Sequence, residues 1–229
     1  MKNILLLHGA IGCKAQLQPM ADFLSSDSKV HTINFEGHGG EGLPNYFSIE
    51  SFADSVKAYI LQQNIFPIHI FGYSMGGYVA MYLASKEPQL VASIVTLATK
   101  FHWDEVTAAK ETAMLNPEKI SLKLPAFATE LQHRHAPNNW KAVLQKTADM
   151  LHAMGNSNPL QPSDYKTIET PILLMLGDRD KMVSLEETVA VYKSLSKAQL
   201  AILPNTGHPI EKVNLIVFEI YKQFVQLLF

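Results

Sequence analysis

Short runs of consecutive apolar residues alternate along this chain with segments whose apolar residues recur at helical spacing. Uninterrupted apolar character over strand length is typical of parallel strands that are buried on both faces. Six such runs cover residues 3–8, 30–35, 67–73, 92–98, 171–176 and 199–203. The alternation predicts an α/β fold, with an open, mostly parallel six-stranded sheet and helices on both faces.

The segments between these runs predict the helices. Residues 48–64 carry apolar side chains at helical spacing, and residues 77–86 read as a helix directly after the third run. Ser184 and Glu187 form a capping-box pattern that predicts the start of a further helix. A last helix is expected over residues 210–229.

Residues 101–166 break the alternation. This stretch contains three or four helical segments separated by prolines and no convincing strand. We therefore divide the chain into a first core part (1–100), a helical insertion (101–166) and a second core part (167–229). The insertion has more apolar residues than a solvated layer needs, so most are expected to pack onto the body and a minority to line a pocket. These residues are Phe101, Trp103, Met114, Leu115, Phe127, Leu131, Trp140, Leu144, Met150, Leu151 and Met154.

One serine lies between two glycines where the third predicted strand meets a predicted helix, in the segment Gly72-Tyr73-Ser74-Met75-Gly76. Such a turn can hold the serine in a strained backbone conformation that lifts its hydroxyl above the sheet edge. Glycines are needed on either side because Cβ atoms there would clash. The alternative is an ordinary strand-to-helix turn that contains a small residue.

Further polar groups follow the last two runs. Asp178 and Asp180 come after the fifth run, and His208 comes shortly after the sixth. The carboxyl ends of parallel strands in an open sheet converge on one crevice, so we expect Ser74, an aspartate and His208 to meet there. The order serine, aspartate, histidine along the chain differs from the orders of the two well-known serine protease families.

Five segments in sequence resemble motifs of the α/β-hydrolase superfamily, and the resemblance covers nearly the whole chain. They are Leu7-His8-Gly9, Gly37-His38-Gly39, the segment from Gly72 to Gly77, the segment from Gly177 to Asp180, and Gly207-His208. The resemblance implies the family's fold without its first two strands, and identifies the insertion as a helical cap over the active site. The trimmed sheet would expose an edge at which a homodimer could form.

The resemblance also implies the roles of three side chains. Ser74 would be the nucleophile, His208 its general base, and Asp180 the carboxylate that orients His208. Asp180 is favoured over Asp178 because its Gly-x-x-Asp spacing matches the family motif. Asp178 is then expected to be a turn residue.

The family pattern assigns the oxyanion hole to backbone groups. The first donor would be the N–H of Met75, and the second that of Ala10, with Ile11 as the other candidate. His8 and His38 lie in glycine turns near the site, where hydrogen bonding of those turns is the expected role.

No cofactor or metal site is expected. His133, Arg134 and His135 raise the question of metal or anion binding, but two histidines two residues apart on a helix point to different faces. A surface helix explains all three without a ligand. No glycine-rich phosphate loop is present.

The expected partner is a small-molecule ester or thioester, and the expected function is that of a carboxylesterase or thioesterase with a small to medium, largely apolar substrate. The segment around Ser74 is also similar to the menaquinone-pathway lyases, but Tyr78 stands where that branch has arginine. C–C bond hydrolysis, perhydrolysis and a receptor role on the same fold remain as alternatives.

Composition adds limits to these expectations. The 229 residues are 47% hydrophobic, which allows one large core, and a net charge of -2 without a basic stripe argues against nucleic-acid binding. Cys13 is the single cysteine, so an internal disulfide is excluded and a reducing compartment is favoured. The first apolar run is too short for a secretory signal or a membrane span. We therefore expect a cytoplasmic protein.

Overall fold

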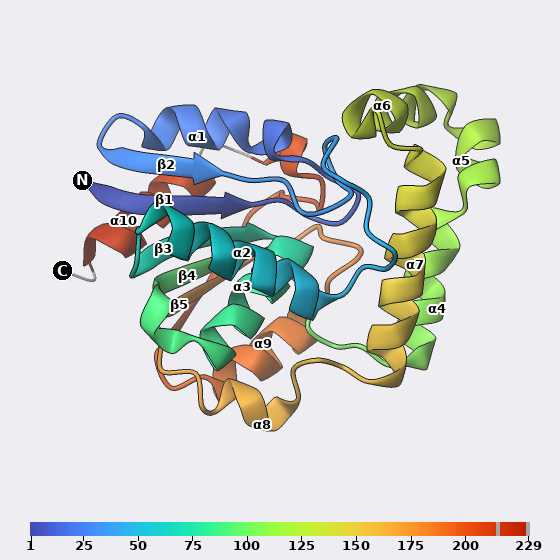
Figure 1. Cartoon of the computed structure of the whole chain (residues 1–229). Coiled ribbons are helices and arrows are strands. Elements are labelled where there is room, and N and C mark those ends of the chain that lie inside the picture. Colours follow the sequence, from blue (N-terminus) through green and yellow to red (C-terminus); the bar gives the residue numbers. More distant parts are fainter. Residues whose placement is uncertain (214–215, 228–229) are drawn as a thin grey trace.

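The computed structural model describes residues 1–213 and 216–227 and is built on one six-stranded parallel sheet (Figure 1). Its strands are β1 (Lys2–Leu7), β2 (Ser28–Thr32), β3 (Ile68–Tyr73), β4 (Val91–Leu97), β5 (Ile172–Gly177) and β6 (Ala198–Leu203), in the order β2-β1-β3-β4-β5-β6. All six predicted runs are confirmed as strands. β2 ends earlier than predicted, because the N–H of Phe35 bonds to the ring of His8 rather than to a neighbouring strand.

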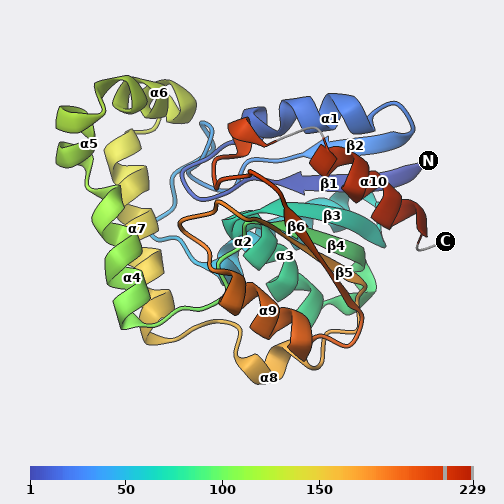
Figure 2. The same cartoon turned by 180° about the vertical axis from the view of Figure 1, so that it is seen from behind.

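Helices cover both faces of the sheet (Figures 1 and 2). One face carries α1 (Gln18–Leu24) and α10 (Ile216–Leu227), and the other carries α2 (Ile49–Gln63), α3 (Met75–Lys86) and α9 (Leu185–Ser194). Each layer buries its own apolar cluster against the strands. The four central strands are therefore largely buried on both sides, which explains their continuous apolar runs, whereas the edge strands β2 and β6 are partly exposed.

Side-chain caps mark the starts of several helices. The Ser48 side chain accepts from the backbone N–H of Ser51 at the start of α2, and Ser184 and Glu187 form the predicted capping box of α9. The last helix begins later than predicted. Ile210–Lys212 form a separate 3-10 turn, and the extended backbone of Val213 interrupts the helix. The predicted end at residue 229 lies outside the described residues.

The insertion forms a helical layer beyond the carboxyl ends of the strands (Figure 1). Its main helices are α4 (Glu105–Thr112), α5 (Pro117–Lys123), α6 (Pro125–His135) and α7 (Trp140–Asn156). The short α8 (Pro162–Tyr165) lies apart from them, next to α9 (Figures 1 and 2). One side of α7 joins the sheet core through Val143 and Met150, and Trp140 and Leu144 pack among α5 and α6. The layer therefore stands over the strand ends.

β2 and β6 form the two edges of the sheet. Pairing of two chains along the β2 edge stays a prediction. Across residues 1–213 and 216–227, every helix falls short of the length and apolar character that crossing a bilayer demands.

Candidate active site

Ser74 occupies a strained turn between β3 and α3. Its φ of 51° and ψ of -118° are unusual for a residue with a side chain. Two hydrogen bonds hold the turn: its N–H donates to Leu97 O at 2.8 Å, and the Thr99 hydroxyl donates to Ser74 O at 2.9 Å. The strain is thus supported by the neighbouring strand, as is typical of functional turns.

The glycines around Ser74 permit close backbone contact. A Cβ atom on Gly72 would lie 2.4 Å from Gly77 Cα, and one on Gly76 would lie 2.4 Å from Leu7 O. Both contacts involve backbone atoms that cannot move aside cheaply. The glycine requirement inferred from the sequence is therefore met at both positions.

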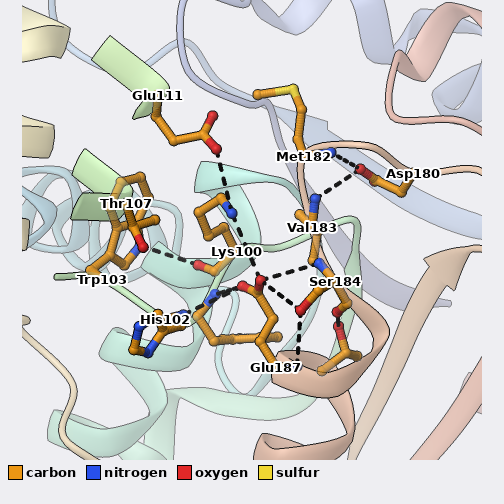
Figure 3. A network of polar contacts seen from close by, with 12 residues as sticks. Lys100, His102, Trp103, Thr107, Glu111, Asp180, Met182, Val183, Ser184 and Glu187 are labelled. Atoms are coloured by element: carbon orange, nitrogen blue, oxygen red, sulfur yellow. Dashed lines mark hydrogen bonds and ion pairs between the residues drawn. The ribbon is translucent and has the colours of Figure 1, made fainter. Parts of the chain in front are cut away.

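Asp180 and His208 meet at the same end of the sheet. His208 Nδ1 lies 2.8 Å from Asp180 Oδ2. Asp180 Oδ1 accepts the N–H groups of Met182 and Val183, as Figure 3 shows. Burial would raise the pKa of Asp180, but these hydrogen bonds outweigh it and hold the pKa below its usual value. Asp178 instead accepts the N–H of Thr206, in keeping with a turn residue.

The Asp180 contact fixes the orientation of His208. An ionised carboxylate can only accept hydrogen bonds, so Nδ1 carries the proton and Nε2 keeps a free lone pair. The Tyr73 hydroxyl donates to the backbone carbonyl of His208 at 3.0 Å, and the two rings lie 5.6 Å apart. His208 is therefore held from two sides.

The loop after β1 is strained at Ile11, whose φ is 51°. A β-branched residue rarely adopts this conformation. The Ile11 carbonyl accepts Arg134 Nη1 at 2.9 Å and lies 3.0 Å from His135 Nε2. Two side chains from α6 thus hold the loop that contains Ala10 and Ile11.

These contacts correct the interpretation of α6 as a plain surface helix. His133 is exposed, but His135 is 1% exposed and Arg134 is largely covered. The two histidines do face different sides, as their spacing predicts. Among the described residues, no group of histidine, cysteine and acidic side chains is arranged to hold a metal ion.

Three buried histidines connect the insertion to the core. The ring of His38 lies 5.3 Å from that of His8 and 5.6 Å from that of His135. His8 accepts from Phe35 N and contacts Gly9 O, and His38 contacts Glu36 O, so both bond their turns as expected. Burial lowers the pKa of His8 and of His135 to about 4. Burial also holds the pKa of His38 well below its ordinary value, so all three rings are neutral at pH 7.

A cavity of about 680 Å³ opens above Ser74, and His208, Met75, Ala10 and Ile11 also line it. Its volume is that of a site for a small to medium ligand. Most of the apolar insertion residues named from the sequence line this cavity, whereas only a minority was expected to do so. Those in the wall are Trp103, Met114, Leu115, Phe127, Met150, Leu151 and Met154.

Four charged residues in this wall were not identified from the sequence, namely Lys100, Glu111, Glu130 and Glu211. Lys100 follows β4 and Glu111 belongs to α4, and both line the cavity. Glu111 falls on the buried face of an amphipathic helix, where a carboxylate is unusual. A carboxylate at an otherwise apolar helix position was therefore the sequence signal that could have identified Glu111.

Comparison with known proteins agrees with this architecture. A family model described as "alpha/beta hydrolase fold" matches residues 2–116, about half of the chain. The pimeloyl-[acyl-carrier protein] methyl ester esterase of Neisseria meningitidis is 24% identical over 230 residues, covering 91% of this chain and 87% of the relative. A putative 2-succinyl-6-hydroxy-2,4-cyclohexadiene-1-carboxylate synthase of Bacillus subtilis is 24% identical over 233 residues, covering 90% and 84%. The crystal structure of a putative lipase from Acinetobacter baumannii superposes with a TM-score of 0.83 at 22% identity, covering 99% of this chain and 84% of that one.

Proposed function

Because this chain belongs to the α/β hydrolase fold family and is a hydrolase of that type, we propose that it cleaves a carboxylic ester or thioester through an acyl-enzyme on Ser74. The substrate is small to medium in size and largely apolar. The observation that carries the proposal is the strained Ser74 in a mainly apolar cavity that also receives the Asp180–His208 pair.

Ser74 supplies the attacking oxygen. His208 Nε2 takes the hydroxyl proton as the Ser74 oxygen bonds to the carbonyl carbon, and then gives that proton to the leaving alcohol or thiol. Water repeats the sequence on the acyl-enzyme and releases the acid. Asp180 keeps His208 in the required tautomer and stabilises the ring while it is charged.

Backbone N–H groups stabilise the oxyanion that forms in each step. The N–H of Met75 lies in the first turn of α3, where helix N–H groups have no acceptor within the helix. The second donor is the N–H of Ala10, with Ile11 as the alternative on the same loop. Loss of one such donor typically costs about 3 kcal/mol of barrier.

The helical layer from α4 to α7 acts as the cap in this proposal. Side chains of this layer line the cavity over Ser74, and this supports the proposed division of the chain into core (1–100), cap (101–166) and core (167–229). We also propose that the protein works in the cytoplasm, in keeping with its single cysteine.

The ester assignment draws support from the similarity to the Neisseria esterase. The lyase alternative is weakened by Tyr78, which lines the cavity. Its hydroxyl accepts the N–H of Leu160 at 2.9 Å and donates to Asn158. The position that would carry an arginine for an anionic substrate thus holds a neutral side chain engaged in the fold.

Turnover and labelling test the proposal together. The protein is assayed with p-nitrophenyl butyrate, p-nitrophenyl octanoate and an octanoyl thioester, and is labelled with a fluorophosphonate. We expect multiple turnovers, labelling of Ser74, and a loss of about 10⁴-fold or more in kcat for Ser74→Ala. Ser85→Ala is the matched control, because Ser85 lies on α3 outside the cavity wall and its hydroxyl donates to Tyr82 O in the preceding turn.

Retained turnover in Ser74→Ala would reject the nucleophile. Labelling of Ser74 without turnover of any ester or thioester would instead favour a receptor on the same fold.

A further inference from the structure

Lys100 and Glu111 form an ion pair in a largely apolar cavity wall, whose other charged residues are Glu130, Arg134 and Glu211. Lys100 is adjacent in sequence to Thr99, whose hydroxyl bonds to Ser74 O, so the position lies next to the strained turn. Glu111 reaches the same place from α4 above the strand ends. Figure 3 shows the ammonium of Lys100 between the carboxylates of Glu111 and Glu187.

Part of the hydrogen-bonding capacity of this pair is unused within the part of the chain that the structure describes. Lys100 Nζ lies 3.5 Å from Glu111 Oε1 and 3.7 Å from Glu187 Oε2, beyond the roughly 2.7–3.2 Å of an N–H···O hydrogen bond. Glu111 Oε1 is buried and has no hydrogen-bond partner among residues 1–213 and 216–227, and its side chain is 5% exposed. Buried polar atoms are almost always satisfied, so this oxygen, which faces the cavity, can accept a hydrogen bond from a group inside it.

Glu187 plays a different part in the same network. Its Oε1 accepts the N–H groups of Phe101 and His102, and its Oε2 accepts the N–H and hydroxyl of Ser184. Its capacity is therefore used by the fold. The free donors of Lys100 and the free acceptor of Glu111 remain as the groups that a ligand can bind.

The charges select the kind of ligand. Two carboxylates flank one ammonium, so the pair does not form a net cation and an anionic group would meet repulsion from Glu111. Arg134, the other cation of the wall, already bonds to Glu130 and to the Ile11 carbonyl. A hydroxyl group can accept from Lys100 and donate to Glu111 at the same time. It satisfies both groups without bringing a further charge into the cavity.

We propose that Lys100 and Glu111 form a polar subsite that binds a hydroxyl group of the substrate, away from the carbonyl that Ser74 attacks. The inference rests on the proposed ester hydrolysis and refines its substrate to a hydroxylated ester. A site built to hydrogen-bond a hydroxyl discriminates strongly against the analogue that lacks it, because the buried polar groups are then left without partners.

A purely structural ion pair between α4 and the core would behave differently. Removal of such an ion pair would lower kcat/KM for all esters by a similar factor. The subsite is therefore tested by a ratio, namely kcat/KM for a hydroxylated ester divided by kcat/KM for its unsubstituted analogue, measured within each variant.

The test uses two series of esters. The first series varies the end of the acyl chain, which carries a hydroxyl in methyl ω-hydroxyhexanoate, a methyl in methyl hexanoate and a carboxylate in monomethyl adipate. The second series varies the end of the alcohol chain, which carries a hydroxyl in ω-hydroxyhexyl acetate and a methyl in hexyl acetate. In the wild-type protein we expect the ratio to be about tenfold or more in one series. In Lys100→Met/Glu111→Met we expect it to fall to about one.

The double variant replaces the charge pair with apolar side chains of similar length, an exchange that buried pairs often tolerate. Glu111→Met alone keeps the Lys100–Glu187 pair and serves if the double variant fails to fold. Lys197→Met is the matched control, because Lys197 pairs with Glu169 on the surface and should leave the ratio unchanged.

Each outcome decides the proposal. A wild-type ratio near one in both series, as expected if water alone occupies the position, or a preference for monomethyl adipate, would overturn it. A lower rate for all esters in the double variant with an unchanged ratio would leave only the structural role. Calorimetric binding of methyl ω-hydroxyhexanoate against methyl hexanoate to Ser74→Ala repeats the comparison without turnover. If no ester is hydrolysed, the proposed function fails, and this binding ratio still supports or rejects the subsite.

Discussion

The hydroxyl of Tyr73 donates a hydrogen bond to the backbone carbonyl of His208, with 3.0 Å between the two oxygens. The residue before Ser74 therefore holds the loop that carries the proposed base. In Tyr73→Phe the His208 carbonyl loses its donor and the loop gains freedom, so we expect kcat to fall about tenfold with little change in KM, at a stability cost of about 1 kcal/mol.

Tyr46→Phe is the control for this substitution, because Tyr46 is 71% exposed. Steady-state kinetics with one p-nitrophenyl ester and thermal unfolding of both variants provide the measurements. An unchanged kcat in Tyr73→Phe would show that the loop is positioned without this bond.

Asp178 and Asp180 offer a matched pair of substitutions in one turn. Asp180→Asn removes the charge that holds the tautomer of His208, and we expect kcat to fall by about 10⁴-fold. Asp178→Asn should keep kcat within about threefold, because an asparagine oxygen can still accept from Thr206 N. Rate measurements on folded variants decide between the two, and a larger loss for Asp178→Asn would reverse the assignment of the carboxylate.

Gly76 tests the close packing that supports the Ser74 turn. A Cβ at this position would lie 2.4 Å from Leu7 O and 2.7 Å from His8 O, so Gly76→Ala must displace the strand or the helix. We expect the free energy of unfolding in urea to fall by about 2–3 kcal/mol or more. Gly42→Ala is the control, since among the described residues no heavy atom other than those of Gly42 and its chain neighbours lies within 4 Å of its added Cβ. Equal stability of the two variants would contradict this packing argument.

The sheet and the polar residues at its strand ends could be predicted because their signals are local. A parallel strand covered on both faces must be apolar at successive positions. A polar residue directly after such a strand lies in the crevice at the carboxyl ends of the strands, where it can bind a ligand or take part in a reaction. The contact between Asp180 and His208 follows from two such strand ends. The capping box at Ser184 is likewise contained within four residues.

Contacts between the insertion and the core could not be predicted in this way. Arg134 and His135 reach the Ile11 carbonyl across more than a hundred residues, and only the docking of α6 on the β1 loop brings them there. The Lys100–Glu111 pair depends in the same way on where α4 lies. Such contacts leave no periodic pattern in the sequence, because they depend on how the helical insertion packs against the core.

The buried histidines give the fold a defined dependence on pH. His8 and His135 have pKa values of about 4 in the folded protein, against an ordinary value of 6.5, because burial penalises their charged forms. Between pH 6.5 and 4 the unfolded chain therefore binds more protons than the folded one. The free energy of unfolding is at its full value above pH 6.5 and falls as the pH decreases through this window.

Replacement of His135 isolates its share of this effect. Unfolding by urea at a series of pH values between 7.5 and 4 gives the slope of stability against pH. Each histidine contributes at most about 1.4 kcal/mol per pH unit inside the window, so His135→Asn should reduce the slope by up to this amount while also lowering stability at pH 7.5 through the lost Ile11 contact. His133→Asn, two residues away on the exposed side of α6, should leave the slope unchanged. If His135→Asn and wild type share one slope, the ring of His135 is hydrated enough in the folded protein to bind a proton freely, and the cluster does not set the acid limit of the fold.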